Sequence, residues 1–323
     1  MHDAVEAETN PLTRLHLDGY TTFHLRLPTL VSEASDKLLC VCCFPQSLHE
    51  RAFVGKHVEP EDLARLLEAD RERPLAVYVH GNAESVHSSL AARNFVNRHL
   101  NAIYLSFEWQ GYGTSISLPP RFDAQSERCR CVLRFLLQRE AGVVRNPILL
   151  VGYSLGCAVL LDAIKKERIA SAARSSSCRA PFGTVLLAPF LSAASLMVSP
   201  PVMTDVVTHL FPPMNNADAV LHLRTDVFVV HGTKDKTIPH RHSFRLVQSF
   251  RSSAGNMPYR SRLLIFPNAT HSDLLVGSNI SHLSLHVREF FRKRMREYGM
   301  RVETFPRRMS ETPTAKATSV LAI

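Results

Sequence analysis

The amino-acid sequence predicts an α/β fold in which a mostly parallel central sheet of about eight strands is flanked by helices. Short apolar runs, among them 75–79, 102–107 and 148–151, alternate along the chain with segments of helical periodicity. The run 148–151 leads into G-Y-S-L-G at 152–156 and then directly into a helical pattern. Strand, helix and strand repeated in this way predict a parallel sheet, because each helix returns the chain to the start of the next strand.

The first half of the chain is expected to open with an antiparallel pair of strands and then to begin this alternation. Alternating apolar residues predict the two strands over 20–27 and 37–44. Leucines on one face predict an amphipathic helix over 61–69. The next expected elements are strand 75–79, a polar helix to about residue 100, strand 102–107 and a helix carrying Cys129, Val132 and Leu136.

The second half of the chain is organised around the buried strand that begins at Ile148 and is expected to stop at Gly152. A helix follows at once, and the Ser-, Ala- and Arg-rich segment 170–180 is expected to be a surface loop. The remaining expected elements are strand 184–187, a short lid at about 191–223, strands 226–230 and 262–266, and a closing helix over 281–298. The lid is too short to form a separate cap domain.

Length and composition predict one domain. The chain has 323 residues, of which 45% are hydrophobic, so it can bury one large core over residues 18–300. Residues 1–17 are polar and without pattern, so a flexible arm is expected there, and a disordered tail is expected over 301–323. The uncharged run 180–204 is long enough to cross a bilayer, but prolines interrupt it and its first part fits a buried strand better.

Cysteine usage and charge limit the setting and the partners. The seven cysteines are an odd number and no signal peptide is expected, so reduced thiols are predicted in an intracellular protein, cytoplasmic or peripheral to a membrane. Cys40, Cys42 and Cys43 lie among apolar strand residues, which favours burial; lipidation of Cys42 or Cys43 is the alternative. The net charge of +9 favours an anionic partner without choosing between a membrane surface and nucleic acid.

Ser154, at the centre of G-Y-S-L-G, is the candidate nucleophile. A strand that stops at Gly152 and a helix that starts after Ser154 would lift the serine hydroxyl to the tip of the sheet. Glycines at 152 and 156 are expected because side chains there would collide with the neighbouring strand and helix. The first helical N–H, that of Leu155, would point at the oxygen that becomes negatively charged during acyl transfer.

The motif alone is weak, so partners must come from other strand ends. Asn82 follows the first parallel strand, Asp235 follows strand 226–230, and His271 follows strand 262–266. Because the carboxyl ends of parallel strands meet at one edge of a sheet, these residues are expected to lie near Ser154. A histidine, with an ordinary pKa of about 6.5, can take the serine proton and return it.

Other polar residues compete for these roles. Asp226 begins its strand and so lies at the wrong end, while Asp273 is expected to stabilise the loop around His271. His80 is expected to be structural. His240 and His242 form an H-x-H pair, but no third metal ligand has suitable spacing, so a solvated loop is expected and no metal.

Four motifs lie in register over residues 20–300: H-G-N-A at 80–83, E-W-Q-G-Y-G at 108–113, L-L-A-P-F at 186–190 and H-G-T-K-D-K-T-I-P at 231–239. Together they resemble α/β-hydrolases of the bud-emergence type, intracellular serine hydrolases related to membrane-associated protein depalmitoylases. The resemblance implies the α/β-hydrolase fold, hydrolysis of carboxylesters or thioesters, and no metal or organic cofactor. The chain departs from that family at Glu108, Gln110, Cys157 and Asn268, and in the continuation N-A-E-S at 82–85.

The sequence therefore predicts a serine hydrolase that acts on acyl esters or thioesters of a lipid or a fatty-acylated protein. Ser154 would attack, His271 would move the proton and Asp235 would orient His271, while the backbone N–H groups of Asn82 and Leu155 would form the oxyanion hole. The lid residues expected to bind the acyl chain are Leu196, Met197 and Met203. The alternatives are a peptidase-like hydrolase and a basic interaction protein that has kept the fold without activity.

The closing helix carries an apolar face and a basic stripe. The apolar residues expected to pack on the sheet are Leu283, Val287, Phe290, Phe291, Met295 and Tyr298. Residues 287–308 contain eight Lys or Arg against three Glu. This surplus would favour an anionic lipid surface by about 1 kcal/mol per charge near it. We therefore expect peripheral contact with an anionic membrane and no nucleic acid.

Overall fold

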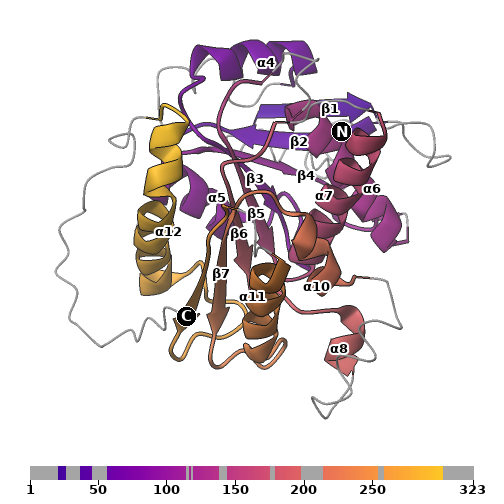
Figure 1. The fold of residues 1–323 in the computed structure, drawn as a ribbon. Coiled ribbons are helices and arrows are strands. Elements are labelled where there is room, and N and C mark those ends of the chain that lie inside the picture. Colours follow the sequence, from indigo (N-terminus) through magenta and orange to yellow (C-terminus); the bar gives the residue numbers. More distant parts are fainter. Residues whose placement is uncertain are drawn as a thin grey trace, which may run out of the picture.

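A single sheet with the strand order β1-β2-β4-β3-β5-β6-β7-β8 runs through the described part of the chain (Figure 1). The computed structural model describes residues 21–26, 37–45, 57–113, 116–117, 119–137, 144–174, 179–197, 214–253 and 258–300. The strands are β1 (Thr21–Arg26), β2 (Lys37–Cys43), β3 (Leu75–Val79), β4 (Ile103–Phe107), β5 (Ile148–Tyr153), β6 (Gly183–Leu187), β7 (Asp226–Gly232) and β8 (Ser261–Phe266). The pairs β1·β2 and β2·β4 are antiparallel and the other pairs are parallel, which confirms the predicted architecture.

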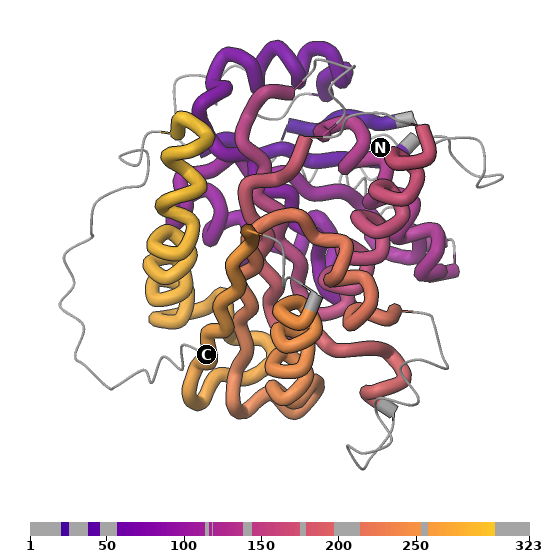
Figure 2. The backbone as a smooth tube through the Cα atoms, viewed as in Figure 1, coloured from indigo at the N-terminus to yellow at the C-terminus, as the bar shows by residue number. Residues whose placement is uncertain are grey.

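Helices cover both faces of this sheet. The helices are α4 (Pro60–Ala69), α5 (Leu90–Asn94), the π-helix η1 (Phe95–His99), α6 (Phe122–Leu137), α7 (Leu155–Ala173), α8 (Ala193–Met197), α10 (Asn216–Ala219), the 3-10 helix η4 (Val220–His222), α11 (Arg241–Ser253) and α12 (Gly277–Glu297). In Figure 2 the indigo N-terminal strands lie at the top and the orange segment with β7, α11 and β8 lies at the bottom, so the chain crosses the whole sheet.

The core has two parts because side chains alternate across each strand. Val77 and Val79 of β3 lie in a cluster with apolar residues of α4, α6, α7 and α11. Ala76 and Tyr78, on the other face of β3, lie in a second cluster with residues of α5, η1 and α12. Every residue of β3 and β5 is buried, as expected for central strands covered on both faces.

Helix boundaries differ from the prediction in two places. The predicted loop 170–180 is wrong at its start, because α7 continues to Ala173; Ser171 donates a hydrogen bond of 3.2 Å to Glu167 one turn earlier. Alanine-rich sequence favours helix, and over residues 170–173 this preference outweighs the one serine. The closing helix α12 begins at Gly277 rather than at residue 281, where Gly, Ser and Asn conceal its start in the sequence.

Several other predictions concern burial and length. Cys40, Cys42 and Cys43 are buried, as predicted, and the predicted apolar residues of α12 from Leu283 to Met295 are buried too. Among the described residues, every helix falls short of the length and apolarity needed to span a membrane. The predicted arm 1–17, the predicted tail 301–323 and the central part of the lid, 198–213, lie outside the described residues.

Candidate active site

The turn between β5 and α7 places Ser154 in a conformation that few residues adopt. Ser154 has φ 52° and ψ −117°, and α7 begins at the next residue. A Cβ atom at position 156 would lie 2.1 Å from the carbonyl oxygen of Val79, and one at position 152 would lie 2.9 Å from Cα of Cys157. Glycine at both positions therefore allows the start of α7 to lie against β3 and β5, as the sequence predicted.

Ser154, His271 and Asp235 come together at the carboxyl ends of β5, β8 and β7. Nε2 of His271 lies 3.0 Å from Oγ of Ser154, and Nδ1 of His271 lies 2.7 Å from Oδ2 of Asp235. A carboxylate accepts hydrogen bonds only, so Nδ1 carries the proton and Nε2 is free to accept from the serine hydroxyl. The Asp235 side chain is fully buried, whereas that of His271 is 20% exposed and can be reached by a substrate.

Asp235 is held as a carboxylate by its hydrogen bonds. Its Oδ1 accepts the backbone N–H groups of Thr237 at 2.9 Å and Ile238 at 2.8 Å. Burial by itself would raise the pKa of Asp235, but hydrogen bonds from His231, His271 and the Ile238 N–H outweigh it and hold this pKa well below its ordinary value. The carboxyl group is therefore ionised at neutral pH and can orient the imidazole of His271.

His231 is a second histidine on the same carboxylate, and sequence reasoning assigned it no role. Its Nε2 lies 3.2 Å from Oδ2 of Asp235 and 2.7 Å from the carbonyl oxygen of Ile238, so Nε2 carries the hydrogen. Its Nδ1 lies 2.6 Å from Oγ of Ser243 and accepts from that hydroxyl. Its place at the end of β7, four residues before Asp235, is the one pattern in the sequence that pointed to it.

The loop after β3 lies against the start of α7, where an oxyanion hole would form. A Cβ atom at Gly81 would lie 3.5 Å from the carbonyl oxygen of Tyr153, and one at Gly156 would lie 2.4 Å from that of His80. Within the described part of the chain, the backbone N–H groups of Asn82 and Leu155 donate no hydrogen bond to another protein group. Both are thus available to a ligand beside Ser154.

Comparison with known proteins agrees with this geometry. The model of the alpha/beta hydrolase family matches residues 76–279, which span β3 to the start of α12 and contain Ser154, Asp235 and His271. The chain belongs to the alpha/beta hydrolase family.

Its curated relatives are longer proteins. The chain is 24% identical over 198 residues to the alpha/beta hydrolase domain-containing protein aho-3 of Caenorhabditis elegans, covering 61% of this chain and 52% of that protein. It is 26% identical over 240 residues to human protein ABHD12B, covering 68% of this chain and 61% of that protein. The chain thus spans about half to three fifths of the length of these relatives.

Solved structures share the fold. A thermophilic esterase from Thermogutta terrifontis superposes with a TM-score of 0.52 at 15% identity, over 83% of this chain and 90% of the esterase. The same esterase has also been solved with butyrate bound. At this identity the likeness shows that this alpha/beta hydrolase has the esterase's fold and no more.

Tyr153, the residue before the candidate nucleophile Ser154, contacts the candidate base His271 in two ways. Its hydroxyl donates a hydrogen bond to the carbonyl oxygen of His271, and the two rings lie 13° from parallel with centroids 5.8 Å apart. Burial raises the pKa of Tyr153 far above its ordinary value, so the hydroxyl stays protonated and remains a donor. Its position in G-x-S-x-G is variable, so the sequence did not mark it.

The competing polar residues lie elsewhere. Asp226 starts β7 at the opposite edge of the sheet, as predicted, and its Oδ2 pairs with Nη2 of Arg260 at 2.6 Å. Asp273 accepts the backbone N–H of Thr270 at 2.7 Å and stabilises the loop that carries His271, also as predicted. His80 is fully buried and stacks on Trp109 with ring centroids 4.0 Å apart.

The prediction of a solvated loop at His242 is wrong. His242 lies in the first turn of α11, is 3% exposed, and its Nδ1 lies 3.4 Å from the Leu191 N–H and from Oγ of Ser195. Burial, followed by the charges of Arg241, lowers the pKa of His242 to about 4. Because α11 packs this turn against the segment after β6, the side chain is buried as a neutral imidazole.

The predicted acyl-binding residues are only partly described. Leu196 lies in α8, after the carboxyl end of β6, and is 42% exposed. The side chain of Met197 and the whole of Met203 lie outside the described residues. The apolar lining of the lid therefore stays a prediction.

Proposed function

We propose that this alpha/beta hydrolase is a serine hydrolase that cleaves acyl esters or thioesters through an acyl-enzyme intermediate. The observation that carries the proposal is the continuous chain of contacts from Ser154 through His271 to Asp235, at 3.0 Å and 2.7 Å. A serine hydroxyl is a weak nucleophile until a base lies within hydrogen-bond reach, and this arrangement supplies one.

In the first half of the reaction, Oγ of Ser154 attacks the carbonyl carbon of the substrate while its proton passes to Nε2 of His271. The carbonyl oxygen becomes an oxyanion and accepts hydrogen bonds from the N–H groups of Asn82 and Leu155. The bond from the carbonyl carbon to the leaving oxygen or sulfur then breaks. His271 gives its proton to that leaving atom, and the acyl group stays on Ser154.

In the second half, water attacks the acyl carbon and loses its proton to Nε2 of His271. The bond to Oγ breaks, Ser154 recovers the proton, and a carboxylic acid is released. Asp235 stays ionised throughout and stabilises the imidazolium that forms in each half. His231 supports this role because it donates to the same carboxylate oxygen.

The substrate class is proposed from the fold neighbours and the lid. An esterase of this fold has been solved with butyrate bound, which supports the proposal of an acyl substrate. Leu196, Met197 and Met203 are proposed to contact the acyl chain here. We propose a lipid ester or a fatty-acylated protein as substrate. The resemblance to the bud-emergence type supports this substrate class. We also propose an intracellular location, cytoplasmic or peripheral to a membrane, and no nucleic-acid partner.

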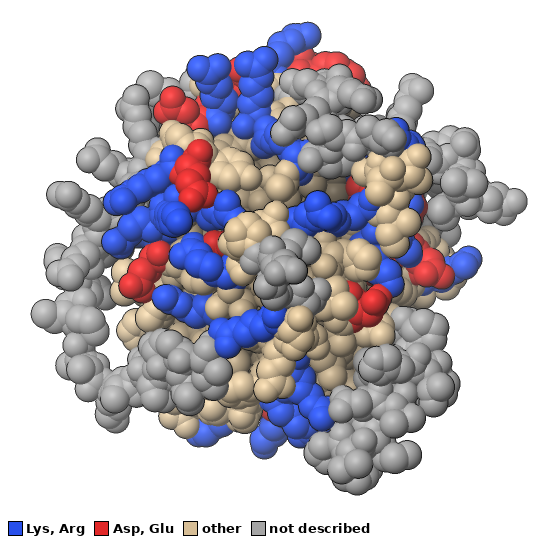
Figure 3. Space-filling view, in the orientation of Figure 1, with Lys and Arg blue, Asp and Glu red and all other residues tan. Residues whose placement is uncertain are grey.

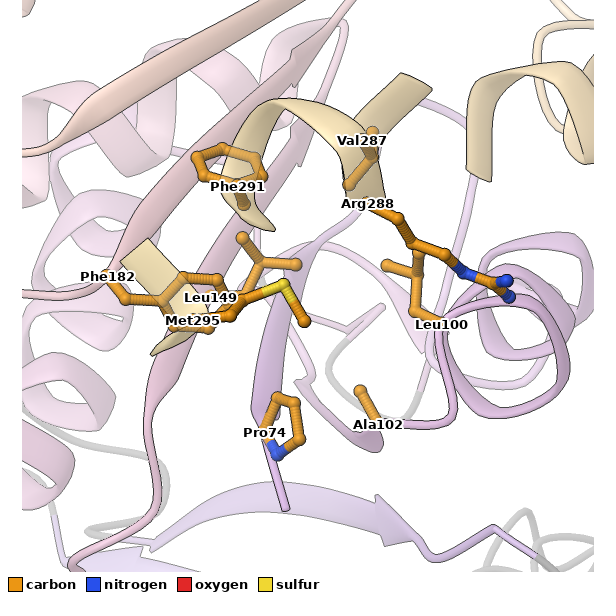
Figure 4. A pocket seen from close by; sticks show the side chains of 9 residues that line it. All are labelled: Pro74, Leu100, Ala102, Leu149, Phe182, Val287, Arg288, Phe291 and Met295. Carbon is orange, nitrogen blue, oxygen red and sulfur yellow. The ribbon is translucent and has the colours of Figure 1, made fainter. Parts of the chain in front are cut away.

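The Lys and Arg side chains of α12 lie away from the edge of the sheet that carries Ser154. Arg288 and Met295 of α12 line a small pocket with Pro74, Ala102 and Leu149, which stand at the starts of β3, β4 and β5 (Figure 4). Figure 3 shows Lys and Arg side chains gathered at the upper left, where Figure 1 places the C-terminal half of α12. An anionic membrane bound there would face the edge of the sheet opposite Ser154, so membrane binding and acyl-chain preference are separate proposals with separate tests.

Labelling with a fluorophosphonate probe tests the function. The wild-type protein should be labelled and should hydrolyse p-nitrophenyl esters, whereas Ser154→Ala should do neither while keeping its circular dichroism spectrum. A series of esters from acetyl to palmitoyl should show faster turnover of the longer chains. Turnover by Ser154→Ala would exclude Ser154 as the nucleophile, and an unlabelled, inactive wild type would leave a binding protein on this fold.

Sedimentation with liposomes tests the membrane contact. Phosphatidylserine vesicles should bind the protein at low salt and release it as salt rises, because salt screens the attraction between exposed basic side chains and anionic lipids. Arg292→Glu combined with Arg296→Glu should weaken this binding without changing ester turnover, since both residues are exposed on α12. Equal binding to neutral vesicles would contradict the electrostatic contact.

A further inference from the structure

Glu84 accepts two hydrogen bonds in the loop that follows β3. Its Oε2 lies 2.8 Å from the backbone nitrogen of Gly81 and 2.9 Å from the hydroxyl oxygen of Tyr78. Glu84 is partly buried, and the residue before it, Ala83, has a positive φ of 63°. The carboxylate therefore links Gly81, the first residue of this tight turn, to the side chain of Tyr78 on β3.

The backbone N–H of Glu84 contacts the carbonyl group of Gly81. Its N–H donates to the carbonyl oxygen of Gly81 at 3.4 Å, and Nδ1 of His80 lies 2.9 Å from that oxygen. An imidazole nitrogen beside a carbonyl oxygen must carry the hydrogen, so His80 donates as well. Gly81 is thus held at its N–H by the Glu84 side chain and at its C=O by two donors.

This hold sets the direction of the next N–H. In a trans peptide the C=O of one residue and the N–H of the following residue point in opposite directions. Donors that draw the carbonyl of Gly81 inward therefore turn the N–H of Asn82 outward. On the same loop, Oδ1 of Asn82 accepts a hydrogen bond from the hydroxyl of Tyr112, which ties the Asn82 side chain to a different segment.

The contacts between Glu84 and Gly81 lie close to the turn that carries Ser154. A Cβ atom at Gly81 would come within 3.6 Å of both Glu84 Oε2 and the Tyr153 ring. Burial and then the charge of Glu84 raise the pKa of Tyr153, the residue before Ser154. A negative charge at this position would oppose an oxyanion nearby, so the two hydrogen bonds, rather than the charge, are the contribution that favours catalysis.

We infer that Glu84 is a positioning residue that clamps Gly81 and so directs the N–H of Asn82 toward the oxyanion formed at Ser154. The inference rests on the proposed serine hydrolase function. An uncharged side chain that places an oxygen atom at the position of Glu84 Oε2 should hold Gly81 in the same orientation. Glutamine can accept the Gly81 and Tyr78 hydrogen bonds, whereas alanine cannot.

The test compares Glu84→Ala and Glu84→Gln with the wild type, with Glu68→Ala as a matched control on the surface of α4. Glu84→Ala should lower kcat about 10- to 100-fold and leave KM within about threefold, because a misdirected oxyanion donor acts on the transition state. Glu84→Gln should recover most of this rate, and Glu68→Ala should match the wild type. The inhibition constant of an alkyl boronic acid, which forms a tetrahedral adduct on serine, should rise for Glu84→Ala in parallel with the loss of kcat/KM.

A second measurement does not depend on turnover. Hydrogen exchange at the Gly81 amide should be faster in Glu84→Ala than in the wild type and Glu84→Gln, while amides in β5 keep their protection. Loss of protection throughout the Glu84→Ala protein would indicate unfolding. In that case Glu84→Gln tests the inference, which requires this variant to keep both the protection of the Gly81 amide and its activity.

Three results overturn the inference. One is a Glu84→Ala variant whose kcat, or whose rate of hydrogen exchange at the Gly81 amide, equals that of the wild type. Another is a Glu84→Gln variant as impaired as Glu84→Ala, which would mean that the charge matters and the clamp does not. The third is a wild-type protein without turnover dependent on Ser154, which removes the proposed function as well; the first two leave that function standing.

Discussion

His231 and His271 share one oxygen of Asp235: Nε2 of His231 lies 3.2 Å from Oδ2, and Nδ1 of His271 lies 2.7 Å from it. One carboxylate oxygen therefore has an imidazole donor from its own strand end and another from the end of β8. His231 is fully buried and its Nδ1 accepts a hydrogen bond from Ser243, so packing and this hydrogen bond hold it beside Asp235. His231 therefore holds the carboxylate independently of His271, whose side chain is 20% exposed.

Replacing His231 should therefore weaken both stability and catalysis. His231→Phe leaves the Ser243 hydroxyl without its buried acceptor, which should cost about 1–3 kcal/mol in the free energy of unfolding. With one donor fewer on Asp235, kcat should fall about tenfold. Denaturant unfolding and ester turnover measure the two effects. Ser243→Ala is the control, because it removes the outer hydrogen bond and keeps the contact with Asp235; kcat losses of equal size in both variants would contradict this role.

The two buried aspartates of β7 and its following loop should respond differently. Asp235→Asn should lower kcat about 10³- to 10⁴-fold, because an amide cannot hold His271 in its working tautomer. Asp226→Asn should leave kcat within about threefold and instead reduce stability, since it breaks the ion pair with Arg260 at the other end of the strand. Steady-state kinetics and thermal unfolding of both variants make the comparison. The reverse ranking would show that the acid is misassigned.

Tyr153→Phe should lower kcat about 3- to 30-fold with little change in KM, because it removes the hydrogen bond to the His271 carbonyl and keeps the ring contact. Tyr298→Phe is a matched control. It also removes a hydroxyl that donates to a backbone carbonyl, that of Ala180 at 3.1 Å, but near the opposite edge of the sheet. Equal kinetic losses in the two variants would indicate a general effect on stability.

The buried His242 should make stability depend on pH. Its pKa is lowered to about 4 in the folded protein, whereas an unfolded histidine has a pKa of about 6.5. The unfolded state takes up the proton first as pH falls, so the contribution is complete above about pH 7 and is lost between about pH 6.5 and 4. The loss at the acid end is on the order of 3 kcal/mol.

Urea unfolding at a series of pH values measures this contribution. The free energy of unfolding of the wild type should fall more steeply between about pH 6.5 and 4 than that of His242→Asn, which has no group to titrate at this position. His240→Asn is the control from the neighbouring, more exposed position. Parallel curves for the wild type and His242→Asn would contradict the burial of a neutral imidazole.

Local sequence determined the parallel strands, the turn at Ser154 and the three residues that meet there. Apolar runs mark β3, β5 and β7 because central strands are buried on both faces, and this signal needs no knowledge of neighbours. The meeting of Ser154, Asp235 and His271 followed from one rule, that the carboxyl ends of parallel strands share an edge. The glycines at 152 and 156 could be assigned from the sequence because the elbow leaves no room for a side chain.

Tertiary structure alone decided which side chains support these three. Tyr153 meets the carbonyl of His271 across 118 positions of sequence, and His242 is buried only where α11 meets the segment after β6. Hydrogen bonds of this kind form between segments that the fold brings together, and a residue's type does not say which partner it will find. The sequence by itself thus determined the candidate reacting groups, because they follow strand ends, and the packing of distant segments determined how those groups are held.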